Sequence, residues 1–154
     1  MSILREIGII ARALDSIANI EFRDLDLARG QYLYLVRIAE QPGMIQEELS
    51  EVLKVDRSTV ARSVKKLEER GLIQQRPRSE NLKTKEWELS EKGKQIYPFI
   101  LGEHLYSERT ALKGFSKKEV AQLEEYLIRV RENITLDWEL VKKGKKRNYS
   151  EVKQ

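Results

Sequence analysis

The sequence contains no cysteine and only one histidine among its 154 residues. Without cysteine there can be no disulfide, no thiolate zinc site and no cysteine redox sensor. A metal site needs several converging ligands, so His104 alone does not predict one, and we expect neither metal nor cofactor. No apolar run reaches the roughly 18 to 20 residues of a transmembrane helix, and residues 1–6 lack the features of an export signal. We therefore expect a cytoplasmic protein with no membrane partner.

The common motifs of catalysis are missing as well. The sequence has no glycine-rich phosphate loop, no serine elbow and no spacing of metal ligands. We therefore expect a protein that is not an enzyme. Charged residues make up 35% of the chain, which suits a helical protein with narrow apolar stripes.

The charge of the chain is unevenly distributed. Residues 54–85 hold ten bases and four acids, and the tail 142–154 holds six bases and one acid, although the whole chain has a net charge of only +4. A basic middle and tail on an acidic remainder indicate a localised contact with a polyanion. The alternative is a solvated surface on which charges cluster by chance.

Four segments show the apolar spacing of three and four residues that is typical of amphipathic helices. They cover residues 3–20, 29–41, about 90–112 and about 116–143. The second has almost no polar face, so we expect it to be central and buried. We expect Ser90 to cap the third segment, and Ser116 with Glu119 to form a capping box for the fourth.

Two shorter helices are predicted between these segments, over 45–53 and from Asp56 to about Glu69. A tight turn at residues 54–55 joins them, Asp56 caps the second helix, and Gly71 stops it. The first helix is expected to turn three side chains inward. These are Leu49, Val52 and Leu53.

Two strands, 72–76 and 85–89, follow the short helices, with a polar hairpin tip over 78–84. Two helices with a tight turn, followed by two strands with a basic loop, form the order of a winged helix-turn-helix. The predicted fold is therefore mainly α, with a small β wing.

The second short helix has two distinct faces. Val60, Val64 and Leu67 share the buried face, and the opposite face carries small hydroxyls near the N-terminus with cations behind them. Such a helix suits the major groove of double-stranded DNA, where an arginine can bind a guanine edge through two hydrogen bonds. The expected DNA contacts on this helix are Arg57, Ser58, Thr59, Arg62, Lys65 and Lys66, and those on the wing are Arg78, Lys83 and Lys85.

Two alternatives remain for this surface. The first is that this face is an ordinary solvated helix surface, since exposed helix faces are polar, and Glu69 on the same face favours this interpretation. The lack of acids from Arg57 to Lys66 favours DNA binding instead. The fold also occurs as a module for protein–protein assembly without sequence-specific DNA binding. Such a module would expose apolar residues on the second helix, where this sequence has polar ones.

Five runs of the sequence carry a resemblance to a known family. They are Gln31-Tyr32-Leu33-Tyr34-Leu35, Gln46-Glu47-Glu48-Leu49, Val55-Asp56-Arg57-Ser58-Thr59-Val60, Leu67-Glu68-Glu69-Arg70-Gly71-Leu72-Ile73 and Leu89-Ser90-Glu91-Lys92-Gly93. Over about 30–100 the chain resembles the MarR family of bacterial and archaeal regulators. The resemblance implies a sequence-specific transcriptional regulator that binds a pseudo-palindromic operator as a homodimer. Many members are repressors that small phenolic or amphipathic ligands release, so an effector of this kind is expected.

The resemblance also implies the organisation of the chain. The whole chain, 1–154, is expected to be one domain, with dimerisation helices at about 1–22 and 116–143, a winged helix-turn-helix at about 30–92 and a linking helix at about 90–113. Apolar stripes on the terminal helices independently favour dimerisation, although they could instead pack within the chain. The stripes are Ile3, Ile7, Ile10, Leu14 and Ile17 in the first, and Val120, Leu123, Leu127, Val130, Ile134, Trp138 and Val141 in the last.

The sequence departs from the family pattern at two places. Ser79-Glu80-Asn81 replaces the usual Asp-x-Arg of the wing tip, so Lys83 or Lys85 must supply the wing contact. Ile45 replaces the usual hydroxyl cap of the first short helix, at a cost of about 1 kcal/mol of local stability.

Two further features allow more than one interpretation. Five aromatic residues could line a ligand pocket or belong to the core: Tyr32, Tyr34, Tyr97, Phe99 and Tyr106. The basic tail at 142–147 could contact DNA or could be a solvated end.

Overall fold

A computed structural model describes residues 2–76 and 84–152 of the chain. The chain forms two compact units, Met1–Arg109 and Thr110–Gln154, which are considered separately below.

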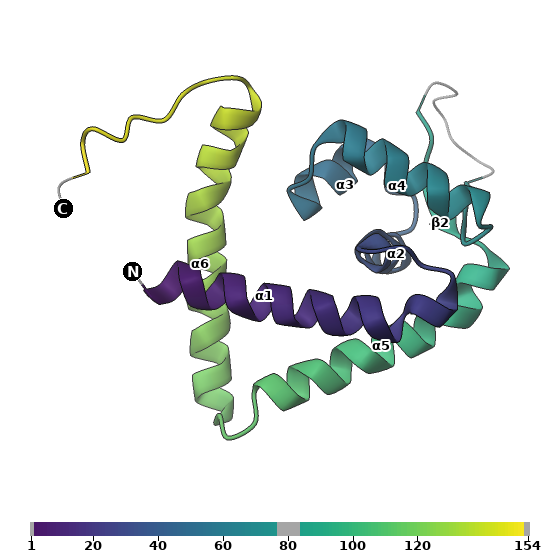
Figure 1. The fold of residues 1–154 in the computed structure, drawn as a ribbon, viewed down its shortest axis with the longest axis horizontal. Helices are drawn as coiled ribbons and strands as arrows, with labels where there is room; N and C mark the ends of the chain where they lie inside the picture. The colour runs from purple at the N-terminus through teal and green to yellow at the C-terminus, as the bar shows by residue number, and fades with distance from the viewer. Residues whose placement is uncertain (1, 77–83, 153–154) are drawn as a thin grey trace. The chain divides into compact units, whose positions relative to one another are not determined.

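The first unit contains most of the helices and a small antiparallel sheet (Figure 1). Its elements are α1 (Ser2–Glu21), the 3₁₀ helix η1 (Arg23–Leu25), α2 (Gln31–Glu40), α3 (Gln46–Leu53), α4 (Arg57–Glu69), β1 (Ile73–Gln75), β2 (Trp87–Leu89) and α5 (Glu91–Ala111). This order confirms the predicted mainly α fold with a small β wing. The helices end within about two residues of their predicted limits, and both strands are shorter than predicted.

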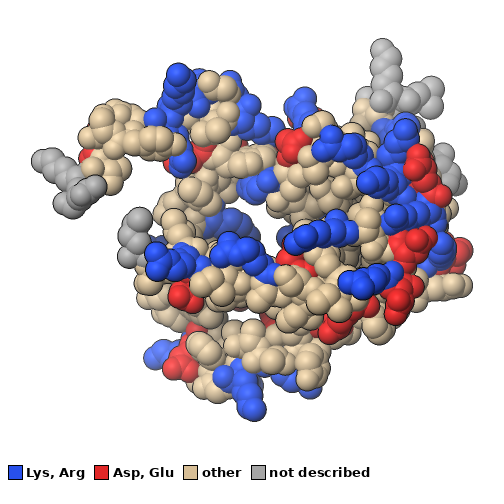
Figure 2. Space-filling model, viewed as in Figure 1, with Lys and Arg blue, Asp and Glu red and all other residues tan. Residues whose placement is uncertain are grey.

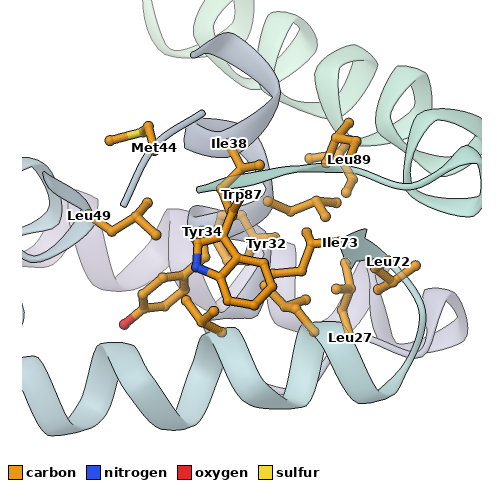
Figure 3. Packing of buried hydrophobic residues seen from close by; sticks show 14 of the residues in the cluster. Leu27, Tyr32, Tyr34, Ile38, Met44, Leu49, Leu72, Ile73, Trp87 and Leu89 are labelled. Atoms are coloured by element: carbon orange, nitrogen blue, oxygen red, sulfur yellow. The ribbon is translucent and has the colours of Figure 1, made fainter. Parts of the chain in front are cut away.

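The core of the first unit is built around α2 and Trp87. Leu35 and Ile38 of α2 are fully buried, and Tyr32 and Tyr34 are nearly so, which confirms that this helix is central. Figure 3 shows the Trp87 indole among the side chains of Tyr34, Ile38 and Ile73. The sheet and α2 therefore share one core, to which α4 contributes Val60, Val64 and Leu67.

The turn between α3 and α4 depends on Lys54 and Ser50. Lys54 adopts a left-handed conformation with φ of 55°. The Ser50 side chain is fully buried, and its Oγ donates a hydrogen bond of 2.5 Å to the Val55 carbonyl oxygen. The Val55 amide also donates to the Ser50 carbonyl oxygen at 3.2 Å. Ser50 is therefore hydrogen-bonded to Val55 across the turn through both its side chain and its backbone.

The prediction that Val52 faces inward is wrong, because its side chain is 42% exposed. Leu49 and Ser50 are the buried residues of α3, and Leu53 packs against the core. The face of α3 that packs against the core therefore includes the polar Ser50 and excludes Val52.

The wing has a further contact that the sequence did not indicate. Strand β1 pairs with β2 in the register Ile73 with Leu89 and Gln75 with Trp87. Met44, before α3, forms an isolated bridge with Trp87, in which the Trp87 amide donates to the Met44 carbonyl oxygen at 2.9 Å. The base of the wing is therefore attached directly to the start of the helix-turn-helix.

The second unit is dominated by α6 (Lys117–Lys142). Ser116 caps it as predicted: its Oγ accepts from the Glu119 amide at 3.1 Å, and the Glu119 carboxylate accepts from the Ser116 amide at 2.7 Å. In the basic tail after α6, Arg147 pairs with Asp137 of that helix at 3.1 Å, so this part of the tail lies back along the helix. Within α6, the Lys142 ammonium lies 4.6 Å from the Trp138 ring centre.

The start of α3 carries half of a capping box. The Glu48 carboxylate accepts from the Ile45 amide at 3.1 Å, but the Ile45 side chain offers no acceptor in return. We expect Ile45→Thr to be more stable than Ile45→Val by about 0.5–2 kcal/mol, because only threonine can accept from a free amide of the first turn. The two variants have nearly the same shape, so urea unfolding of both isolates the hydroxyl group. Equal free energies of unfolding would show that this helix start needs no second cap.

Candidate nucleic-acid interface

The exposed face of α4 is the one predicted from the sequence. Ser58, Arg62 and Lys65 are exposed, while Val60, Val64 and Leu67 on the opposite face have no exposed surface. Arg57 and Lys66 are also exposed, and Thr59 is half-buried. Figure 2 shows Lys and Arg side chains gathered over the region of α4, with acidic side chains on neighbouring parts of the same face. The cations of the helix therefore face solvent together.

At the N-terminus of α4, the Asp56 carboxylate organises both hydroxyl groups of the exposed face. Its Oδ2 accepts from Ser58 Oγ at 2.6 Å and from the Thr59 amide at 3.0 Å, and its Oδ1 accepts from Thr59 Oγ1 at 2.6 Å. These bonds, first that from Ser58 and then those from Thr59, hold the pKa of Asp56 well below its usual range. Asp56 was predicted as a cap, which is confirmed, but its bonds to the two hydroxyls were not predicted.

Arg62 is attached to the same group of residues. Its Nη2 donates to Thr59 Oγ1 at 3.2 Å, so Arg62, Thr59 and Asp56 form a continuous chain of hydrogen bonds along the helix. The guanidinium is thus held on the exposed face, and the described part of the chain leaves most of its donors available. This arrangement suits a side chain that must reach a base edge in a defined direction.

Two other cations of α4 form ion pairs at the surface. Arg57 lies 3.2 Å from Glu47 of α3, and Lys65 lies 4.0 Å from Glu69. All four side chains are more than half exposed, so these pairs contribute little to stability. A phosphate can therefore compete with the carboxylates for both cations. The role of Glu47 was not predicted, because it lies ten residues before Arg57 and only the fold brings them together.

The wing is described in part. Lys85 is exposed on the segment that leads into β2, whereas Arg78 and Lys83 lie outside the described residues. Arg76 continues β1, with its amide donating to the Glu86 carbonyl oxygen at 2.7 Å. Its guanidinium lies 3.5 Å from the Pro42 carbonyl oxygen, which places a further cation at the base of the wing.

Arg70, at the C-terminal end of α4, fixes the helix to the segment between α1 and α2. Its Nη1 donates to the Asp26 carbonyl oxygen at 2.7 Å and to Gln31 Oε1 at 2.8 Å. Gln31 is only 3% exposed, so this is a nearly buried polar contact. It was not predicted, since its partners lie about 40 residues away.

The five aromatic residues proposed for a ligand pocket have different environments. Tyr32 and Tyr34 are core residues, Tyr97 packs partly buried against the core, and Phe99 and Tyr106 are 56% and 72% exposed. Burial, followed by the hydrogen bond of 2.5 Å to Asp15, raises the pKa of Tyr32 far above its ordinary value. The Tyr32 ring also packs near the rings of Phe22 and His104.

Comparison with known proteins identifies the family. A model of the MarR family matches residues 27–85 of the chain. The HTH-type transcriptional regulator YybA of Bacillus subtilis (strain 168) is 59% identical over 147 residues, which cover 96% of this chain and 98% of that protein. The chain belongs to the MarR family.

Solved structures of MarR proteins agree with the fold described above. A MarR family transcriptional regulator from Listeria monocytogenes, complexed with a 26mer DNA, is 53% identical with a TM-score of 0.91, covering 95% of this chain and 97% of that one. A MarR protein from Peptoclostridium difficile DA00132 is 30% identical with a TM-score of 0.84, covering 92% of each chain. The chain is therefore a DNA-binding transcriptional regulator of the winged helix-turn-helix type.

Within residues 2–76 and 84–152, no helix combines the length and the apolar character needed to cross a membrane.

Proposed function

We propose that the chain is a homodimeric repressor that binds a pseudo-palindromic operator through α4 and the wing. The exposed face of α4 carries the proposal: Ser58 and Arg62 for base edges, with Arg57, Thr59, Lys65 and Lys66 around them. On the wing, Lys85 and, outside the described residues, Arg78 and Lys83 are proposed for the phosphate backbone. The relative from Listeria monocytogenes that is complexed with DNA supports assigning this surface to DNA.

The homodimer is supported by the terminal helices. Ala18 is the only buried residue of α1, and α6 has none. Within the apolar stripes, Ile10 is 53% exposed and Ile134 is 51% exposed. Large apolar stripes that the chain leaves open are suited to a second copy, and a dimer would bring two α4 helices to the two half-sites.

The dimer gives a direct prediction of mass. Light scattering at micromolar concentration should report about twice the 18.1 kDa of one chain. A single species at the mass of one chain would contradict the two-fold architecture, and with it the symmetric operator.

The proposal includes a small, largely apolar effector, such as a phenol, that releases the operator. The ring cluster of Phe22, Tyr32, Phe99 and His104 supports it, because Phe99 joins the cluster while remaining 56% exposed. Asp15 and Glu103 both act electrostatically on Tyr32, so the surroundings disfavour an anion. Titration of the protein–DNA complex with neutral phenols and with salicylate compares the two classes, and no release by either would indicate a regulator without such an effector.

Selection of bound genomic fragments tests the proposed function. Fragments of the organism's own DNA, incubated with the protein at moderate salt and sequenced after repeated selection, should contain a two-fold symmetric motif. Its half-sites should lie about 10 base pairs apart from centre to centre. Binding without any enriched motif would contradict sequence-specific regulation and would favour the protein–protein assembly module. The face of α4 argues against that module, since its exposed side chains are polar or charged.

A further inference from the structure

Chemistry fixes the direction of the hydrogen bonds at the N-terminus of α4, and what this means for DNA recognition rests on the proposed function. A hydroxyl group has one proton to donate and two lone pairs to accept with. An ionised carboxylate can only accept. Where a hydroxyl lies within hydrogen-bond distance of a carboxylate, the hydroxyl must therefore be the donor, and its remaining capacity is that of an acceptor.

Asp56 imposes this direction on two residues at once. Ser58 Oγ and Thr59 Oγ1 each lie 2.6 Å from one of its carboxylate oxygens. The low pKa of Asp56 means that the carboxylate stays ionised throughout the physiological pH range. Thr59 Oγ1 already accepts one bond from Arg62 at 3.2 Å. Ser58 is exposed, so its oxygen is the one best placed to accept from a DNA base.

The major groove offers different partners to a donor and to an acceptor. Adenine N6 and cytosine N4 carry amino groups that donate, whereas guanine O6 and N7 and thymine O4 accept. An oxygen that presents only lone pairs is attracted to the amino groups and repelled by the acceptor atoms. We propose that Asp56 is a specificity-determining positioning residue: its carboxylate accepts the hydrogen bonds that the Ser58 and Thr59 hydroxyls can donate, so that α4 favours bases with a major-groove amino group.

The experiment begins with the operator selected by the wild-type protein. Ser58→Ala identifies the base pair that Ser58 reads, as the position whose preference disappears. At that position the amino group is then removed chemically, by purine in place of adenine or 2-pyrimidinone in place of cytosine. The wild-type protein should lose about two- to tenfold in affinity, the loss expected for one hydrogen bond. The Ser58→Ala variant should show no additional loss from the altered base.

The role of Asp56 is tested by Asp56→Ser. Serine is as good a helix cap as aspartate, but its shorter side chain cannot hold both hydroxyl groups. Inverting the base pair read by Ser58 should cost the wild-type protein about two- to tenfold, because it replaces a donor by an acceptor. In the Asp56→Ser variant that penalty should fall to nearly none. Glu69→Gln removes one negative charge at the other end of α4 and should keep the wild-type penalty.

Thermal unfolding of each variant shows whether it is folded at the assay temperature. Two results would overturn the inference: an equal loss from amino deletion in the wild type and in Ser58→Ala, or an unchanged inversion penalty in Asp56→Ser. In the second case Asp56 would be only a helix cap. If the wild-type protein selects no motif at all, the proposed function fails and the inference with it. That result is distinct from the other two, since both of them require a selected operator.

Discussion

Gly93→Ala is expected to lower the free energy of unfolding by about 3 kcal/mol or more, the upper end of the usual cost of overpacking. A Cβ built on Gly93 would lie 2.2 Å from the Leu72 carbonyl oxygen, far inside van der Waals contact. That oxygen cannot easily move, because it accepts from the Ser90 amide at 3.1 Å and because Leu72 itself is fully buried. The close approach allows the first turn of α5 to pack directly against Leu72, the residue that precedes β1.

Gly102→Ala in the same helix is the matched control. A Cβ at Gly102 would meet no atom within 4 Å, so the substitution should raise stability by about 0.5–1 kcal/mol, as alanine does in helix interiors. Urea unfolding followed by circular dichroism measures both variants. Similar midpoints for Gly93→Ala and the wild type would mean that α5 can shift away from Leu72 at little cost.

Much of the fold could be predicted because it depends on local patterns. The spacing of Val60, Val64 and Leu67 predicted which face of α4 is buried, and all three are fully buried. The caps at Asp56 and Ser116 are short-range features as well, and both are confirmed. Local patterns of this kind are sufficient to predict which face of α4 meets solvent. That face carries most of the residues proposed to contact DNA.

The features that the sequence did not reveal depend on contacts between distant residues. Val52 is exposed because the buried Ser50 holds the turn, and apolar spacing takes no account of a buried polar side chain. The bridge from Met44 to Trp87 and the bonds from Arg70 to Asp26 join segments about 43 residues apart. Such pairs have no periodic signal, so they become visible only when the chain is folded.

Arg62→Ala is expected to weaken binding to the specific operator by about 1–3 kcal/mol, with a much smaller loss on random DNA. The reason lies in the geometry of α4. Arg62 is exposed one turn after Ser58, and a bond to Thr59 Oγ1 at 3.2 Å directs its guanidinium. Within residues 2–76 and 84–152 this bond leaves other donors of the guanidinium for a guanine edge. Losing those donors removes base discrimination together with affinity, so the ratio of specific to random binding should fall.

Lys85→Ala provides the contrast, because Lys85 lies exposed on the wing and is expected to contact phosphate. Its replacement should weaken binding to all duplexes about equally and reduce the slope of log affinity against log salt by about one. Both variants are measured on the selected operator and on a random duplex at several salt concentrations. An equal loss on both duplexes for Arg62→Ala would refute direct reading of a base by this residue. If neither variant changes affinity, DNA does not bind this face, and the protein–protein assembly module becomes the better explanation of the fold.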